Sequence, residues 1–174
     1  MKNQKPKDGN QKPKDDLVSL KSADAYEVFL TALKTRIRRA QVKATLSVNA
    51  ELTLLYWQLG QDILQRQAQE GWGSKVIARL AKDLKQAFPN MKGFSRTNLM
   101  YMRAFAAAWP DKQNVQRTAG QIPWRHNQAL LDKLDEPEKR LWYAQQSLEN
   151  GWSRDVLIMQ IQSGLYLRQG GCNH

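Results

Sequence analysis

The sequence predicts an all-α protein. In several long stretches, apolar residues recur every three or four positions, which is the period of one face of an α-helix. Glycine and proline separate these stretches, and serine or aspartate stands where several of them begin. With 41% hydrophobic residues and six tryptophans, the chain can bury the apolar faces of such helices. We therefore expect one helical domain over residues 22–169.

The two ends of the chain differ from this domain. Residues 3–8 and 10–15 repeat the polar sequence NQKPKD, which contains no apolar residue to bury. We expect residues 1–21 to form a disordered basic tail and residues 170–174 a short second tail. The basic tail either keeps the protein in solution, the interpretation we favour, or tethers it nonspecifically to DNA.

Two apolar stripes predict a long helix, or a pair of helices, over residues 24–69. Asp24 and Glu27 have the spacing of a capping box at its start. Ser47 either caps a second helix or lies inside a single one. Gly60 costs a helix about 1 kcal/mol relative to alanine, so we expect a neighbouring element to pack closely against it.

A helix-turn-helix is expected over residues 74–109. Its first helix covers residues 74–87 and its turn residues 89–94. The second helix begins at a Ser95 cap and ends at Trp109, because Pro110 cannot continue it. The turn exceeds that of a minimal helix-turn-helix, which favours a looser or a winged variant. Residues 111–123 are expected to form a flexible loop, with a short hairpin or wing as the alternative.

Three further helices are expected in residues 124–167. They cover residues 124–134, then run from Asp135 or Pro137 to Asn150, and finally cover residues 153–167, so that the last two form a second small helical hairpin. Asp135 and Glu138 again have capping-box spacing. Residues 71–75, 93–96 and 151–154 share the order glycine, aromatic, serine, basic, each before a predicted helix that the serine would cap. They are either three ordinary helix starts or the marks of two stacked helix-turn-helix units.

The charge of the chain indicates a polyanionic partner. Lysine and arginine outnumber aspartate and glutamate by 27 to 16, for a net charge of +11. Charge by itself does not choose between nucleic acid and an acidic membrane. Residues 75–103 carry seven of the basic residues and one acid, Asp83, which leaves a net charge of +6. More than half of the excess positive charge therefore lies in the predicted helix-turn-helix.

A helical wheel places these cations on one face. In residues 74–87 they lie opposite the apolar side, and in the next helix Arg96, Thr97, Met100 and Arg103 share an outward face with the small residues Ala104 and Ala107. Small residues let a helix backbone approach a DNA groove, and basic or hydroxyl side chains near its N-terminus contact bases and phosphates. The candidate DNA contacts are Lys75, Arg79, Lys82, Lys85, Lys92, Ser95, Arg96, Thr97, Met100, Arg103 and Arg125.

A second group of cations lies in the first long helix. Five basic residues stand there without an intervening acid: Lys34, Arg36, Arg38, Arg39 and Lys43. They either contact phosphates or keep that helix solvated. Phosphate contacts supply affinity without sequence information, so no target sequence follows from either group.

The sequence contains no recognisable catalytic constellation. Metal-dependent nucleases need two or three converging carboxylates, and the acids of residues 132–138 are better explained as helix caps and first-turn charges. His126 has no nearby cysteine, nor a serine with a carboxylate, to form a triad, which favours a structural histidine in a turn. There is no glycine-rich phosphate loop, so we expect no cofactor and no metal.

The expected location is cytoplasmic. The one cysteine, Cys172, cannot form an internal disulfide, which fits a reducing compartment. The N-terminus lacks the apolar region of a secretory signal, and no run of about 18 apolar residues occurs.

Several motifs in order resemble the N-terminal domain of the YhcG family. They are LLYWQLG at residues 54–60, residues 71–110, IPWRHNQALLDKL at residues 122–134, and residues 138–170. The resemblance implies a bacterial DNA-binding domain that precedes a nuclease domain of the PD-(D/E)XK type, in proteins of mobile-element, restriction or defence character. Arg125 stands where family members often have glycine. The catalytic residues of the family have no matching positions here, so none are carried over.

These observations predict a DNA-targeting module without catalysis of its own. It would bind duplex DNA and act as a truncated gene product or with a separately encoded nuclease subunit. The alternative is a protein-interaction or homodimerisation module, in which the long helix pairs with another chain through Leu52, Leu55, Tyr56, Trp57 and Leu59.

Overall fold

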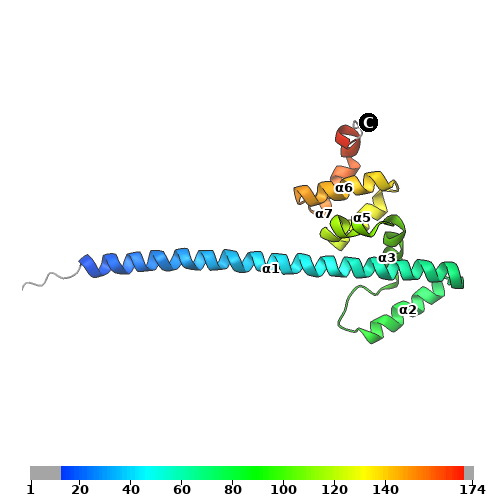
Figure 1. Cartoon of the computed structure of the whole chain (residues 1–174), viewed down its shortest axis with the longest axis horizontal. Coiled ribbons are helices and arrows are strands. Elements are labelled where there is room, and N and C mark those ends of the chain that lie inside the picture. Colours follow the sequence, from blue (N-terminus) through cyan, green and yellow to red (C-terminus); the bar gives the residue numbers. More distant parts are fainter. Residues whose placement is uncertain (1–12, 171–174) are drawn as a thin grey trace, which may run out of the picture. The chain divides into compact units, whose positions relative to one another are not determined.

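The computed structural model describes the backbone of residues 13–170 and the side-chain surroundings of residues 23–169. Over this range the secondary structure is helical with connecting turns, and no strand occurs (Figure 1). The prediction of an all-α protein is therefore confirmed. By packing, the chain divides into a unit that ends at Thr45 and a second unit that begins at Leu46.

The first helix, α1 (Pro13–Glu70), is continuous. The predicted capping box at Asp24 and the alternative of a new helix at Ser47 are therefore wrong, because no glycine or proline interrupts the helix at either place. The tail predicted for residues 1–21 is helical from Pro13 onward. A proline is accommodated at the first position of a helix because the N–H it lacks would have no partner within the helix. The rest of that tail, residues 1–12, and residues 171–174 lie outside the described residues.

The second unit begins with two helices, α2 (Ser74–Ala87) and α3 (Arg96–Ala108), whose bounds agree closely with those predicted. The two helices pack on the last turns of α1 through an apolar cluster. It consists of Tyr56, Ile63, Ile77, Ala81, Phe94, Leu99 and Met102. Gly71 and Gly93 have φ angles of +64° and +116° before these helices, a conformation that favours glycine. Ser74 is the first residue of α2 and Gly73 is its N-cap, so the predicted serine cap is wrong there.

Residues 111–123 form neither a flexible loop nor a wing. They fold into α4 (Lys112–Arg117), which Asp111 caps, and the 3₁₀ turn η1 (Ala119–Gln121). The reason lies in the spacing of Val115, Ala119 and Ile122, which places all three in the core. Asn49 of α1 fastens the turn because its Nδ2 atom donates to the Ile122 carbonyl at 2.9 Å.

The C-terminal helices are α5 (Trp124–Lys133), α6 (Pro137–Asn150) and α7 (Arg154–Gln162). Pro137 begins α6 after an N-cap at Glu136, so the predicted capping box at Asp135 is wrong. Ser153 caps α7 as predicted, but α7 ends before Leu167, because Gly164 turns the chain at a φ angle of +68°. The chain continues into a π-helical turn, η2 (Tyr166–Gly170).

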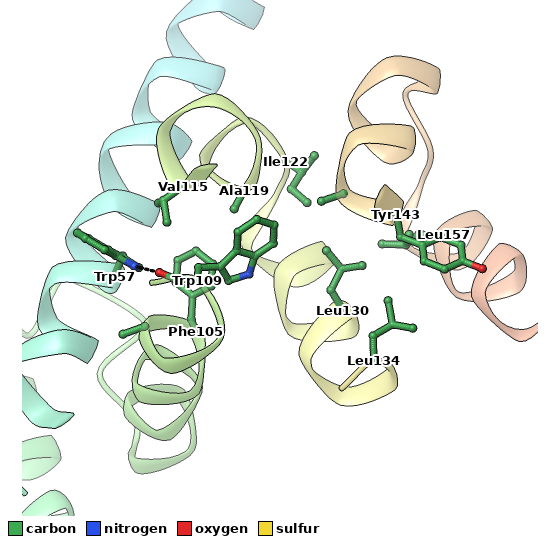
Figure 2. Close-up of a cluster of buried hydrophobic side chains, with 12 residues drawn as sticks. Trp57, Phe105, Trp109, Val115, Ala119, Ile122, Leu130, Leu134, Tyr143 and Leu157 are labelled. Carbon is green, nitrogen blue, oxygen red and sulfur yellow. Dashed lines mark hydrogen bonds between the residues drawn. The ribbon is translucent and has the colours of Figure 1, made fainter. Parts of the chain in front are cut away.

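One apolar cluster joins all of these helices except α2 (Figure 2). Its buried residues are Trp57, Phe105, Ala106, Trp109, Val115, Ala119, Ile122, Leu130, Leu134, Tyr143, Ala144 and Leu157. Trp57 of α1 donates its indole N–H to the Trp109 carbonyl at 2.7 Å, which ties α1 to the end of α3. Trp57 and Tyr56 are 5% and 3% exposed. These two residues are therefore unavailable for the contact with another chain expected from the sequence.

Gly60 lies where α1 and α3 are in close contact. A methyl group on its Cα would overlap the Met102 carbonyl and would lie 2.9 Å from Cβ of Ala106. The expectation that Gly60 permits close packing is confirmed.

Candidate nucleic-acid interface

The outward face of α2 carries the predicted cations. Lys75, Arg79, Lys82 and Lys85 are all exposed, while Ile77 and Ala81 are buried on the opposite side. This confirms the segregation predicted by the helical wheel. Arg79 is partly compensated because its Nε atom lies 3.7 Å from a carboxylate oxygen of Asp83.

The start of α3 is fixed by a serine cap. The Ser95 hydroxyl accepts a hydrogen bond from the Asn98 backbone N–H at 3.1 Å, and the Leu99 N–H donates to the Ser95 carbonyl. The backbone N–H groups of Arg96 and Thr97 precede the first helical bond and therefore have no partner within α3. Both side chains are exposed. Ser95 thus shapes this end of α3 through its cap rather than through a free hydroxyl.

The outward face of α3 carries small side chains in the second half of the helix. Ala104 and Ala107 are exposed, as predicted. Met100 and Arg103 are largely buried. Met100 packs against the apolar cluster that joins α1, α2 and α3, and the buried Nε of Arg103 has no acceptor among the described residues. Of the predicted α3 contacts, Arg96 and Thr97 are therefore the most accessible.

Asn98 joins the start of α3 to the start of α5. Its amide donates to the Gly93 carbonyl at 2.6 Å, and its side-chain oxygen accepts from the Trp124 indole at 2.8 Å and from Gln128 at 3.1 Å. Asn98 was not among the candidate contacts predicted from the sequence. A signal was present, since Asn98 is a polar residue on the apolar side of α3, and a buried amide needs partners.

A second bond shows that α3 and α5 run in the same direction. The Tyr101 hydroxyl, one turn after Asn98, donates to the carboxylate of Asp132, one turn after Gln128, at 2.8 Å. This hydrogen bond raises the pKa of Tyr101, with smaller contributions from burial and from the Asp132 charge, whereas the charge of Arg154 opposes the rise. The N-terminal ends of α3 and α5 therefore lie side by side.

The start of α7 lies next to the start of α5. Nε2 of His126 is 2.8 Å from the Trp152 carbonyl, which can only accept, so Nε2 carries the proton. His126 is 7% exposed, in agreement with the structural role predicted for it.

Three helix starts are thus linked in a row, and each has an exposed arginine in its first turn: Arg96, Arg125 and Arg154. We call this surface the three-arginine end. Arg125 lies between Trp124, which contacts α3, and His126, which contacts the start of α7. Arg154 was not among the predicted contacts, although the repeated order of glycine, aromatic, serine and basic residue indicates it. Asp155 beside Arg154 lowers the charge of this third start.

Of the remaining predicted DNA contacts, Lys85 and Lys92 lie near the connection from α2 to α3, whereas Lys75 lies near the start of α2. The rings of Phe88 and Phe94 lie 6.1 Å apart, which brings the last turn of α2, with Lys85, close to the connection that holds Lys92 and leads to α3. Lys75 stands near the other end of α2, about 15 Å from Lys85 along the helix axis. The described residues contain no cluster of three or more histidine, cysteine, aspartate or glutamate side chains able to hold a metal.

The sequence was compared with known proteins. Residues 32–168 match the model of the DUF1016 N-terminal domain. The chain belongs to this family. The match agrees with the resemblance to the N-terminal domain of YhcG proteins, and it covers that N-terminal domain only. No curated protein and no solved structure matches the chain.

The matched range of this DUF1016 domain includes α2 to α7 and hence the whole three-arginine end. Within the described part of the chain, no helix combines the length and the apolar character needed to cross a membrane.

Proposed function

We propose that this DUF1016 N-terminal domain binds duplex DNA and contributes binding rather than catalysis. The observation that carries the proposal is the three-arginine end, where the starts of α3, α5 and α7 are linked and each presents an arginine to solvent. Helix N-termini attract phosphate through free N–H groups and the helix dipole. Arginine adds a forked donor that suits phosphate and guanine alike.

The proposed helix-turn-helix consists of α2 and α3. In this arrangement α3 is the recognition helix, with Arg96 and Thr97 near its N-terminus and Ala104 and Ala107 allowing the backbone to approach a groove. The exposed cations of α2 would contact the flanking phosphates, which supply affinity without sequence preference. We propose that a separately encoded nuclease subunit supplies the cleavage of DNA. A DNA partner also implies a cytoplasmic location in a bacterial cell.

Binding of a fluorescein-labelled duplex, followed by anisotropy over a series of salt concentrations, tests the proposal. The logarithm of the association constant should fall linearly with the logarithm of salt concentration, with a slope of about −0.9 for each phosphate contacted. Arg96→Gln and Arg125→Gln should each weaken binding at least about tenfold, since a charged hydrogen bond is worth roughly 1.5–3 kcal/mol. Each should also make the slope shallower by about one contact. Arg154→Gln should have a smaller effect because of Asp155.

Arg117→Gln is the matched control. Arg117 is also exposed, but it lies on α4, whose residues Val115 and Gln116 line a hollow together with Ala50 and Leu54 of α1. Its replacement removes the same net charge and should change affinity by less than about twofold, the effect of long-range charge alone. Equal losses for Arg117→Gln and Arg96→Gln would mean that only net charge matters, and would refute the assignment of the three-arginine end.

A further inference from the structure

The part of α1 in the first unit has an exposed apolar stripe. Tyr26 and Ile37 of this stripe are 61% and 57% exposed, and Phe29, which flanks it, is 59% exposed. Isolated helices in water depend on the packing of an apolar face, so a stripe of this length requires a partner. We infer that a second copy of this chain covers it, with the two helices parallel and in register.

The spacing of the stripe is that of a coiled coil. Its members follow one another at intervals of four, three, four, three and four residues: Tyr26, Leu30, Leu33, Ile37, Ala40 and Ala44. This is the alternation of the two core positions of a heptad, with a mean period of 3.5 residues. The same register next meets Ser47 and Glu51, which are exposed. The stripe therefore ends near Ala44, next to the boundary of the first unit.

The charges that flank the stripe select the orientation. Leu30, Ile37 and Ala44 occupy the first of the two core positions of the heptad. In a parallel pair, the residue directly before such a position faces the residue five places later in the second chain. Phe29 then meets Lys34 of the second copy, Arg36 meets Gln41, and Lys43 meets Val48. No two like charges meet, and the lysine stem can lie along the phenylalanine ring.

An antiparallel pair centred on the same stripe is unfavourable. It would place Lys34 beside Lys34 of the second copy and Arg36 beside Arg36, because the core pairs would then be Leu33 with Ile37 and Leu30 with Ala40. Like charges at these flanking positions are destabilising. Charge thus favours the parallel arrangement without requiring an acidic partner.

The stripe is short, and the small apolar area that it can bury limits the stability of the dimer. Two aromatic side chains that are about 60% exposed offer on the order of 120 Å² each, and the aliphatic residues add less. The total lies below the roughly 800 Å² per partner of a standard interface. The dimer is therefore weak and reversible, as interfaces below the standard size are.

Analytical ultracentrifugation of the full chain over a range of concentrations tests the inference. The unchanged protein should pass from monomer to dimer with rising concentration. Ile37→Asp places a charge in the stripe and should abolish the dimer. Val42→Asp is the control, because Val42 is 58% exposed, like Ile37, but lies on the opposite side of α1. Val42→Asp should dimerise as the unchanged protein does.

Two further measurements test whether the second unit of Ile37→Asp stays folded and whether the paired helices are parallel. All six tryptophans lie between residues 57 and 152, so an unchanged fluorescence spectrum of Ile37→Asp would show that the second unit remains folded. In a Cys172→Ser background, Ala40→Cys should form an interchain disulfide on mild oxidation, because parallel helices in register bring the two introduced thiols together. An antiparallel pair would place residue 40 opposite Leu30 and give no such bond.

The inference is wrong if the unchanged chain remains a monomer at all concentrations, or if Val42→Asp disrupts the dimer as strongly as Ile37→Asp. A dimer in which the Ala40→Cys variant forms no interchain disulfide would overturn the parallel register. None of these outcomes depends on DNA binding, so the two proposals fail separately.

Discussion

Replacing Gly60 by alanine tests how tightly α1 and α3 are packed. The new methyl group would overlap the Met102 carbonyl, which belongs to the backbone of α3 and cannot rotate away. Overpacking of this kind costs roughly 1–3 kcal/mol, with larger costs where the obstacle is rigid. Alanine returns about 1 kcal/mol through its higher helix propensity. Because the obstacle here is backbone, we take the upper end of this range and expect a net loss of about 2 kcal/mol in the free energy of unfolding, or roughly 4–8 °C in Tm for a chain of this size.

Thermal and urea unfolding monitored by circular dichroism measures this loss. Gln61→Ala is the matched control, because Gln61 is the next residue of α1 and is exposed; it should change stability by no more than about 0.5 kcal/mol. The double variant Gly60→Ala with Ala106→Gly should recover only a small part of the loss, since it relieves the contact with Ala106 but not that with Met102. A Gly60→Ala protein as stable as the unchanged chain would refute the close approach of the two helices.

Three other variants test contacts of the second unit. Asn98→Ala leaves the Trp124 indole without its acceptor; we expect a loss of about 1–3 kcal/mol by urea unfolding, and a loss no greater than that of an exposed residue would contradict the linking role. Tyr101 should lose its bond to Asp132 as the pH rises through its raised pKa, because a raised folded-state pKa stabilises only below that value; tyrosinate absorbance should therefore appear at lower pH in Asp132→Asn, and identical titrations would count against the bond. Arg140→Met removes the donor to the Leu134 and Asp135 carbonyls and should cost roughly 1.5–3 kcal/mol; unchanged urea stability would show that these bonds contribute nothing.

The positions of the helices could be predicted because the signals for them are local. Apolar spacing identified α2 and α3 almost to the residue, and positive φ at Gly71, Gly93 and Gly151 explains why each repeated motif ends one segment before the next helix. The wheel of α3 likewise placed Ala104 and Ala107 on the open face. Such features depend on residues within a few turns of one another.

The contacts between helices could not be predicted in this way. The bonds from Asn98 to Trp124 and from His126 to Trp152 join residues far apart in the sequence, and no pattern within one helix encodes them. The three-arginine end is a product of those bonds. For the same reason the core role of residues 115–122 was missed: their polar neighbours resemble a loop, and three apolar residues are too few to establish a helical period.

The two helices of the proposed helix-turn-helix are held with different rigidity, which separates their roles in the proposed binding. α2 buries only Ile77 and Ala81 and begins at a glycine without a side-chain cap. α3 buries five residues and is fixed at its start by Ser95 and Asn98. A cation on a loosely held helix still attracts phosphate, because Coulomb attraction is insensitive to small displacements, whereas a hydrogen bond to a base edge requires a fixed donor position. The cations of α2 would therefore set affinity for any duplex, and discrimination between sequences would arise at Arg96 and Thr97.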